Sequence, residues 1–304
     1  MPDDLSPNAL SCYGNQDIKT PGLDRLANEG MRFTNALTTN SFCTPARAAM
    51  LTGKYSHKNG CLRLNQPFDG TQQTYPKLLQ KAGYQTALFG KWHLLTQPTG
   101  FDYYCVMKMQ GAHRNPRVWE TGDPWIAWTK DSEEWNKGGR ILPGHEVDSF
   151  TDASIRWIQN RDKSKPFCLL LHPKSPHQPF EPVEKYKDFL ANVEIPEPNT
   201  LLDDYAGRTP KAIEDIMISN RLAIAPRFLE KLTAEQHDHW NRDQKTKYIY
   251  QNEFIKGYYR LVMGLDDNVT KLLDFLKMSG LEENTVVVQR VNHSLDTGRE
   301  VCVT

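Results

Sequence analysis

Apolar residues recur along most of the chain at spacings that predict helices alternating with short strands. Leu23, Leu26 and Ala27 lie three and four positions apart, as on one face of a helix, and a Thr-Pro pair precedes them while Gly30 follows. The same criteria predict strands over residues 31–33, 84–89, 167–171 and 285–288. Between these strands they predict helices over residues 75–81, 152–161, 226–232 and 248–278. This alternation predicts an α/β fold with a mixed, largely parallel central sheet flanked by helices.

The longest predicted helix, over residues 248–278, has a continuous apolar face. Its apolar residues recur at spacings of three and four, and they are Phe254, Tyr258, Leu261, Val262, Leu265, Val269, Leu272, Leu273 and Leu276. Asp266 and Asp267 fall within the same stretch. We interpret both of these aspartates as structural residues.

Two long stretches lack a clear apolar period. Residues 104–144 are rich in Trp, Gly, Pro and His and are predicted to be a loop region, whereas the polar residues 181–244 are predicted to be an insert over the core. Loops on the site side of an α/β sheet often carry specificity. The tryptophans of the first stretch either stack on a ligand ring or, more often, pack in the core; they are Trp119, Trp125 and Trp128. Its basic side chains are predicted to be surface charges; they are His113, Arg114 and Arg117.

Length and charge narrow the classes of function. The 304 residues are enough for one large α/β domain or two smaller ones. Lysine plus arginine and aspartate plus glutamate both total 37, so the net charge of zero gives no electrostatic reason to expect nucleic acid or an anionic membrane as a partner. No apolar run approaches the length of a membrane span, and the first residues lack the basic and apolar pattern of a signal peptide.

The cysteines are spread widely over the chain. There are six, at positions 12, 43, 61, 105, 168 and 302. No two of them form a C-x-x-C pair, so the sequence does not predict a zinc site. A chain of this length does not need disulfides to fold, and the cysteine count therefore indicates no redox compartment.

The candidate chemistry is concentrated in the stretch from Cys43 to Gly53. Thr44 suits a helix N-cap and Pro45 the first helical position, so a short helix is predicted to begin directly after Cys43. The positive end of that helix favours an anion and lowers the pKa of a thiol in front of it. Arg47, in the first turn, can reach the same anion with its guanidinium group. The alternative is a buried cysteine that acts as a small hydrophobic residue, with Arg47 in solvent.

A second polar motif follows the strand predicted to end at residue 89. Lys91 and His93 are two residues apart, so both can face one side of an extended segment. In that arrangement the lysine supplies charge to an anion and the histidine supplies a proton near neutral pH. The alternative is an exposed lysine beside a histidine held by ordinary hydrogen bonds.

Together these motifs resemble those of the sulfatases, the formylglycine-dependent type I branch of the alkaline phosphatase-like superfamily. The family signature is similar to the string C-T-P-A-R-A-A-M-L-T-G at residues 43–53. The resemblance implies that a formylglycine-generating enzyme oxidises Cys43 to formylglycine, whose hydrate attacks sulfur. The second family motif is similar to G-K-W-H-L at residues 90–94, which implies that Lys91 and His93 contact the sulfate of the substrate.

A third matching position is His177, in the proline-rich run H-P-K-S-P-H-Q-P-F at residues 172–180. The resemblance implies that His177 contacts the sulfate and protonates the leaving oxygen, while Arg47 and the second motif stabilise charge on the sulfuryl oxygens. A loop histidine held by a backbone carbonyl is the alternative. His172 and Lys174 are weaker candidates for the same site.

The resemblance also implies a calcium site. In sulfatases a buried strand ends in Asp-Asp-Leu and both carboxylates bind calcium, which assigns Asp3 and Asp4 as ligands beside the residue derived from Cys43. By their position in the run Q-R-V-N-H-S, Asn292 and His293 take the places of the remaining ligands. Because calcium prefers carboxylate charge, asparagine at the place of the family's aspartate is expected to weaken the site. Without the resemblance, Asp3 and Asp4 would be interpreted as solvated charges.

The resemblance covers nearly the whole chain and implies a sulfuric ester hydrolase that acts on a sulfated small molecule, sugar or glycan. Residues 1–304 are predicted to be one sulfatase catalytic domain that lacks the family's first strand and C-terminal subdomain, with loop or insert regions at 104–144 and 181–244. The alternatives are an inactive truncated homologue and a phosphate or phosphonate ester hydrolase of the same superfamily. Sulfatases are commonly exported, periplasmic or lysosomal, but no signal peptide is found in this chain and no compartment is predicted.

Overall fold

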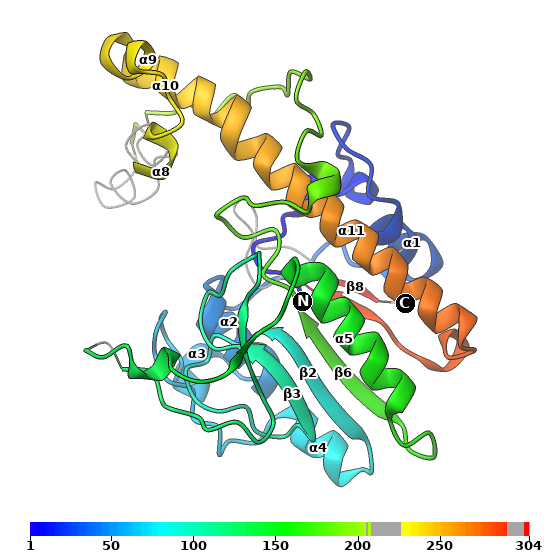
Figure 1. The fold of residues 1–304 in the computed structure, drawn as a ribbon. Helices are drawn as coiled ribbons and strands as arrows, with labels where there is room; N and C mark the ends of the chain where they lie inside the picture. Colours follow the sequence, from blue (N-terminus) through cyan, green and yellow to red (C-terminus); the bar gives the residue numbers. More distant parts are fainter. Residues whose placement is uncertain (130, 205, 208–225, 291–300, 304) are drawn as a thin grey trace. The chain divides into compact units, whose positions relative to one another are not determined.

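The computed structural model describes residues 1–129, 131–204, 206–207, 226–290 and 301–303. The chain forms two compact units, which are Met1–Val183 together with Leu261–Thr304, and Glu184–Arg260. The first unit has a central sheet with helices on both faces (Figure 1). Helices α2 (Cys43–Thr52) and α4 (Tyr75–Lys81) lie on one face and α5 (Glu146–Asn160) lies on the other. The predicted class, a mixed α/β sheet flanked by helices, is confirmed.

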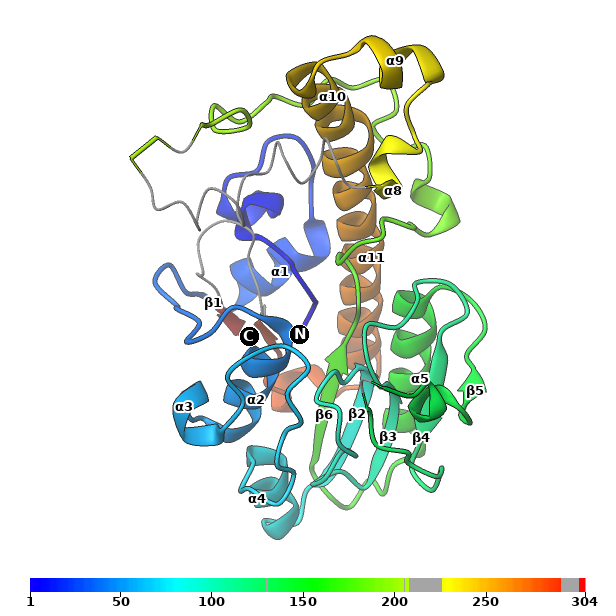
Figure 2. The same cartoon turned by 90° about the vertical axis from the view of Figure 1, so that its left-hand side faces the viewer.

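The central sheet contains both parallel and antiparallel strands. Its order is β5-β4-β3-β2-β6, and Figure 2 shows β4, β3, β2 and β6 side by side. Strand β2 is parallel to β3 and to β6, whereas β4 is antiparallel to β3 and β5 is antiparallel to β4. The bounds are Gln85–Lys91 for β2, Tyr103–Met107 for β3, Arg117–Glu120 for β4, Arg140–Ile141 for β5 and Phe167–His172 for β6. The three parallel strands end at one edge of the sheet, where α/β folds place their sites.

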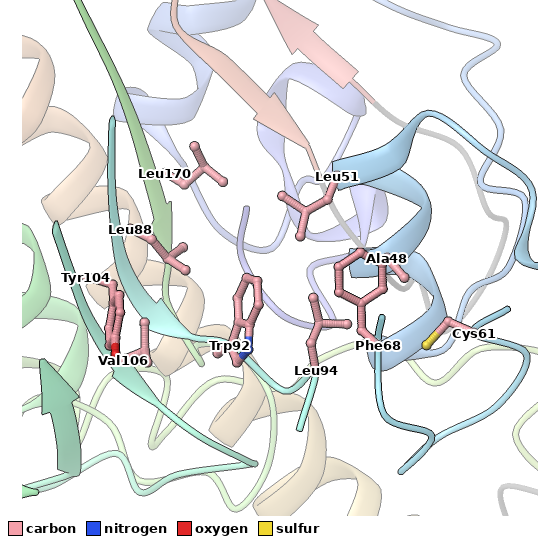
Figure 3. Packing of buried hydrophobic residues seen from close by; sticks show 10 residues of the cluster. All are labelled: Ala48, Leu51, Cys61, Phe68, Leu88, Trp92, Leu94, Tyr104, Val106 and Leu170. Atoms are coloured by element: carbon pink, nitrogen blue, oxygen red, sulfur yellow. The ribbon is translucent and has the colours of Figure 1, made fainter. Parts of the chain in front are cut away.

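Successive side chains of the parallel strands point to opposite faces of the sheet and divide the apolar residues between two cores. Figure 3 shows the first core, where the sheet meets helix α2; its buried members include Ala48, Leu51, Leu88, Trp92, Tyr104, Val106 and Leu170. The second core lies against helix α5 and includes Ala87, Phe89, Cys105, Met107, Val118 and Phe150. Because both faces are covered, these strands are nearly continuous apolar runs rather than alternating ones.

The predicted helices are present, in several cases with shifted ends. The helix expected over residues 75–81 has those bounds. The helix expected over residues 248–278 is interrupted by a π-helical turn at Tyr250–Phe254. Among the described residues the α-helices are α1 (Pro21–Glu29), α2 (Cys43–Thr52), α3 (Ser56–Asn59), α4 (Tyr75–Lys81), α5 (Glu146–Asn160), α8 (Pro226–Leu229), α9 (Ala234–His239), α10 (Arg242–Ile249) and α11 (Ile255–Met278).

Residues 104–144 differ from the loop region that the sequence predicts. This stretch supplies most of β3 and all of β4 and β5. Strands β4 and β5 have four and two residues, too few for a period-two pattern to be recognised. Trp119 in β4 is buried, and Trp125 packs edge-on against Tyr104, so both tryptophans pack in the protein rather than stand free as a stacking surface.

Asp266 has the structural role that the sequence indicates. This buried residue of α11 accepts hydrogen bonds from the backbone N–H groups of Gly22 (3.1 Å) and Leu23 (2.8 Å) in the first turn of α1. It therefore satisfies donors that the helix leaves unpaired. The residue expected to cap α1, Thr20, instead directs its hydroxyl to the carboxylate of Asp24, 3.1 Å away.

A second, antiparallel sheet has the order β1-β8-β7, with bounds Met31–Arg32, Val301–Val303 and Val288–Arg290. The strand expected over residues 285–288 thus begins at the last of those positions. No helix among the described residues combines the length and the apolar character that crossing a membrane requires.

The unit Glu184–Arg260 contains capped helices and aromatic contacts, among them Phe228 with Phe254 and Trp240 with Tyr248. Both α9 and α10 begin with a reciprocal capping box, formed by Thr233 with Gln236 and by Asn241 with Gln244. Within the same unit the Gln251 side chain exchanges two hydrogen bonds with the backbone of Ile195 (2.9 and 2.6 Å). This contact joins residues 56 positions apart.

Candidate active site

Cys43 is the first residue of helix α2, two positions before Pro45, which the sequence predicts as the first helical residue. Phe42 occupies the cap position, and the hydroxyl of Thr44 has no hydrogen-bond partner among the described residues, so the predicted threonine cap is wrong. Gly53 ends the helix with φ of 65°, as expected. Burial, and after it the charge of Asp3, raise the pKa of the Cys43 thiol to about 12. The prediction of a lowered thiol pKa is therefore wrong, because these effects outweigh Lys91 and the other nearby cations.

Arg47 and Lys91 converge on the carboxylate of Asp3. Arg47, 1% exposed, donates from Nη2 to Asp3 Oδ1 (3.2 Å) and from Nη1 to the carbonyl oxygen of Lys91. The fully buried Lys91 Nζ contacts Asp3 Oδ2 and lies 3.9 Å from Cys43 Sγ. Burial opposes ionisation of Asp3, but Lys91 and then Arg47 outweigh it and hold the pKa of this carboxyl well below its usual range. The result is a buried cluster of fixed charges beside the sulfur.

Asp4 and His177 form the more open side of the site. Asp4 has the left-handed φ of 63°, which is strained for a non-glycine residue and typical of functional sites. Its Oδ2 lies 3.5 Å from His177 Nε2, and both side chains are about 15% exposed. Burial, followed by the charge of Asp3, raises the pKa of Asp4 to about 8. Two adjacent carboxylates thus share one small volume, and the second resists ionisation.

His93 lies at the same edge of the sheet, two residues after the end of β2. Its φ is 52°, another left-handed conformation, and its backbone N–H donates to the carbonyl of Lys108 (3.1 Å). The side chain is buried, and its Nδ1 has no hydrogen-bond partner within the described part of the chain. Burial, then Lys91 and Arg47, hold the pKa of His93 well below its usual value. The imidazole is therefore neutral, and its Nδ1 is a buried polar atom without a partner among the described residues.

Four side chains of this site offer atoms that could hold a metal ion. One ligand atom from each of Asp3, Asp4, Cys43 and His177 lies within 4.8 Å of the others. The carboxylates fit a hard cation such as calcium. Burial and then the charge of Asp3 raise the pKa of Asp4, and a bound cation would offset both effects. Two of the predicted ligands, Asn292 and His293, lie outside the described residues.

Several residues of the site carry little or no signal in the sequence. Gln110 Oε1 accepts a hydrogen bond from Lys91 Nζ, and His172 Nδ1 lies 3.3 Å from Arg47 Nη1. His113 was predicted to be a surface charge, but this prediction is wrong because its side chain is buried. Its Nε2 lies 2.7 Å from the carbonyl oxygen of His177. These contacts join residues that are 19, 125 and 64 positions apart, so no local pattern could reveal them.

Glu146 also carries no signal in the sequence, and it contacts the weak candidate Lys174. Glu146 is fully buried at the start of α5 and accepts hydrogen bonds from the backbone of Lys174 and Ser175. Lys174 Nζ lies 3.4 Å from His177 Nδ1. The weak sequence candidates His172 and Lys174 are therefore neighbours of the stronger ones. The predicted site residues within the described part of the chain form one cluster, and they are Cys43, Arg47, Lys91, Asp3, Asp4 and His177. His93 lies close enough that, after burial, the charges of Lys91 and Arg47 lower its pKa.

The chain was compared with known proteins. The Sulfatase family model matches residues 1–289. The N-acetylglucosamine-6-O-sulfatase of Bacteroides thetaiotaomicron is 37% identical over 325 aligned positions, covering 95% of this chain and 56% of that protein. The ulvan-active sulfatase of Formosa agariphila is 24% identical over 94% of this chain and 47% of its own length. The chain thus spans about half the length of these curated relatives.

Solved structures give the same picture. A protein bound to its substrate D-glucosamine-2-N,6-O-disulfate superposes with a TM-score of 0.83 and 32% identity, over 100% of this chain and 69% of that one. The phosphonate monoester hydrolase of Agrobacterium radiobacter, with a TM-score of 0.60 and 17% identity over 99% of this chain and 66% of its own, shares the fold alone. A family model that matches nearly the whole sequence, and a relative 37% identical along 95% of it, establish that the chain belongs to the sulfatase family.

Proposed function

We propose that this protein hydrolyses sulfate esters of sugars, with a formylglycine derived from Cys43 and a calcium ion held by Asp3 and Asp4. The observation that carries the proposal is the buried charge cluster beside Cys43. Lys91 Nζ lies 3.9 Å from Cys43 Sγ, and the Asp3 carboxylate contacts both Lys91 and Arg47. Fixed cations next to the position of a nucleophile suit an anionic sulfuryl group better than a neutral substrate. Asn292 and His293 stay predicted ligands of the same ion.

The cofactor groups supply two elements of the chemistry. Formylglycine, when formed, supplies a hydrated aldehyde as the oxygen nucleophile that the Cys43 thiol, with its raised pKa, does not provide. Calcium, when bound, supplies positive charge beside the sulfuryl oxygens. The chain's own residues do the rest: Arg47 and Lys91 hold positive charge in a buried, preorganised position, where it stabilises negative charge that grows in the transition state.

The histidines are placed to handle protons and orientation. His177 Nδ1 lies 2.5 Å from the carbonyl oxygen of Gln178, and because a carbonyl only accepts, Nδ1 carries the hydrogen. The other nitrogen, Nε2, faces Asp4 Oδ2 at 3.5 Å and carries a hydrogen only when the ring has taken a second proton from solvent. Burial, and after it the charge of Lys91, lower the pKa of His177 to about 3, so this imidazolium is a strong acid that gives its Nε2 proton to the leaving oxygen. His93, neutral and with Nδ1 unoccupied, is suited to a hydrogen bond with the bound substrate.

The substrate class is argued from the relatives. The protein 37% identical to this chain is named for N-acetylglucosamine 6-O-sulfate, and the solved structure at 32% identity holds a 6-O-sulfated glucosamine. These support a 6-O-sulfated amino sugar as substrate. A phosphonate or phosphate ester is the competing substrate class, and here the only support is a shared fold at 17% identity. Assignment of residues 181–244 to an insert within one catalytic domain stays a prediction.

The proposal is tested by sulfate release. The chain is produced in cells that contain a formylglycine-generating enzyme, and conversion of Cys43 is verified by mass. Glucosamine 6-sulfate is then supplied with calcium, and released sulfate is measured by ion chromatography against a Cys43→Ala control. We expect release by the converted protein only, and slower hydrolysis of the matched 6-phosphate. A converted protein that releases no sulfate, or prefers the phosphate, contradicts the proposal.

A further inference from the structure

The segment that carries His177 gains little support from regular secondary structure. It follows the end of β6, and prolines at 173, 176 and 179 interrupt it, each without a backbone N–H to donate. Within the segment the His177 N–H bonds back to the carbonyl of Lys174 (2.9 Å). Its conformation must therefore depend on contacts from elsewhere in the fold.

One buried carboxylate provides most of those contacts. Glu146, the first residue of α5, is 0% exposed. Its Oε2 accepts from the backbone N–H of Lys174 (3.0 Å), and its Oε1 accepts from the N–H of Ser175 (2.8 Å) and from the Ser175 hydroxyl (2.6 Å). Three donors on Lys174 and Ser175, the residues three and two positions before His177, thus converge on one side chain.

His113 links the same carboxylate to His177 itself. Its Nε2 donates to the His177 carbonyl oxygen (2.7 Å), and its Nδ1 lies 3.6 Å from Glu146 Oε1. The backbone N–H of Glu146 in turn donates to the His113 carbonyl (2.7 Å), and the His113 ring stacks on His145, with centroids 5.5 Å apart. Burial opposes ionisation of Glu146, but its contacts with His113 and Ser175 lower its pKa overall, so it stays a carboxylate.

We propose that Glu146, acting with His113, is a positioning residue that holds His177 for proton transfer to the leaving oxygen. Together with His113, Glu146 acts through the backbone on both sides of Pro176. In the step it serves, sulfur bonds to the oxygen of the nucleophile as its S–O bond to the alcohol breaks. The leaving oxygen takes the Nε2 proton of the His177 imidazolium, which becomes a neutral ring with its hydrogen on Nδ1. The inference rests on the proton-donor role given to His177 in the proposed function.

The substitution Glu146→Gln separates this role from simple packing. An amide has one acceptor oxygen and an NH₂ group where the carboxylate has two acceptors, so it cannot satisfy the donors of both Lys174 and Ser175 in the same way. A shift of His177 by about 1 Å costs about a hundredfold in rate. Only esters whose leaving oxygen needs a proton should register that loss.

The kinetic test therefore varies the leaving group. Wild type, Glu146→Gln and the control Asp266→Asn are assayed on phenyl sulfate and on 4-nitrophenyl sulfate, which share a ring but differ in the basicity of the leaving oxygen. Asp266 is a fair control because it is also buried and also accepts two backbone N–H bonds, at the start of α1. We expect Glu146→Gln to lower kcat about a hundredfold on phenyl sulfate and by about threefold or less on the nitrophenyl ester, with KM little changed. Equal losses on both esters contradict the inference.

A second measurement does not depend on turnover. Amide hydrogen exchange is followed in a peptide covering residues 172–180, whose few N–H groups include those of Lys174 and Ser175. Both amides should lose protection in Glu146→Gln and keep it in Asp266→Asn; unchanged protection in Glu146→Gln contradicts the contact. A wild-type protein that releases no sulfate from any ester would instead contradict the proposed function, and the two failures are distinguishable.

Discussion

Two buried lysines at the ends of neighbouring strands have very different surroundings. Lys91 ends β2 and pairs in register with Met107 of β3, and Lys108 follows directly, so both lysines lie at the same edge of the sheet. Lys91 is 0% exposed and Lys108 is 4% exposed. The first contacts the Asp3 carboxylate, whereas the second faces the rings of Trp119 and Trp125, 4.3 and 4.5 Å from their centroids.

The difference lies in what offsets the cost of burying a charge. Lys108 donates to the carbonyl oxygens of Ile126 (3.2 Å) and Trp135 (3.0 Å) and gains cation–π contacts, yet burial still lowers its pKa to about 8. Its role is to tie a long connection to β3. Lys91 has a carboxylate that also binds Arg47 and that a metal ion can share. Burial alone therefore does not mark a site; a network of opposite charges does.

Removal of the Lys91 charge should have the largest effect. Lys91→Ala takes away one of two buried cations beside the proposed nucleophile, and we expect kcat for a sulfate ester to fall by about a thousandfold. The matched variant Lys108→Met removes an equally buried lysine outside the charge cluster and should keep kcat within about threefold of wild type. Steady-state kinetics on both proteins checks this, and similar losses in the two would remove the distinction.

A smaller loss is expected from Arg47→Lys. The arginine bridges Asp3, the Lys91 carbonyl and His172 at once, and an ammonium group keeps the charge but not this planar geometry. We expect kcat to fall by about a hundredfold while the protein stays folded. Activity close to wild type would mean that the charge alone, and not its orientation, matters at this position.

Chelation of calcium should lower the thermal stability of the protein through the carboxylates of Asp3 and Asp4. If calcium binds the folded protein at Asp3 and Asp4, ethylenediaminetetraacetate (EDTA) should lower the Tm by about 4 °C, because a ligand at a hundred times its Kd contributes about 2.7 kcal/mol to a chain of 304 residues. Differential scanning fluorimetry gives the shift. Asp4→Asn should reduce the response and Lys108→Met should retain it. A calcium response that Asp4→Asn leaves intact would place the ion elsewhere.

The smallest effect concerns the pH dependence of Lys108. Its pKa falls from the ordinary 10.5 to about 8 on folding, so between these values the unfolded chain binds a proton that the folded protein does not. Stability therefore rises with pH across this window, relative to a protein without the group. The difference in Tm between wild type and Lys108→Met should shift in favour of wild type from pH 8 to pH 10.5. A difference that does not vary with pH would contradict the lowered pKa.

The residues that meet at the candidate site were predictable where they lie in short sequence motifs, and their chemical roles stay predictions. Cys43 with Arg47, Lys91 with His93, and His177 each lie in a short string, and the structure brings them to one edge of the sheet. Glu146 and His113 were not predictable, because their contacts to the His177 segment cross 28 to 64 positions and a buried glutamate resembles any helix-starting acid. The positions of Asn292 and His293 lie outside the described residues and stay predictions.

The fold was likewise predictable where local residues determine an element and not where contacts between distant residues determine it. Helix α4 has its predicted bounds because a proline and a glycine delimit it. The segment 104–144 was predicted as loop, because its strands β4 and β5 are short and owe their pairing to neighbours such as Val106, which lies opposite Trp119. The thiol pKa was predicted in the wrong direction, because the helix terminus is a local feature whereas burial beside Asp3 arises only in the folded chain.

The mass of the peptide that contains Cys43 tests the central claim most directly. The chain is expressed beside a formylglycine-generating enzyme, digested, and compared with a second sulfatase converted in the same cells. Conversion of the thiol to the aldehyde removes about 18 Da, and we expect that loss in most of the peptide. An unmodified thiol, in cells that convert the second sulfatase, would contradict the proposal that this site works through a formylglycine.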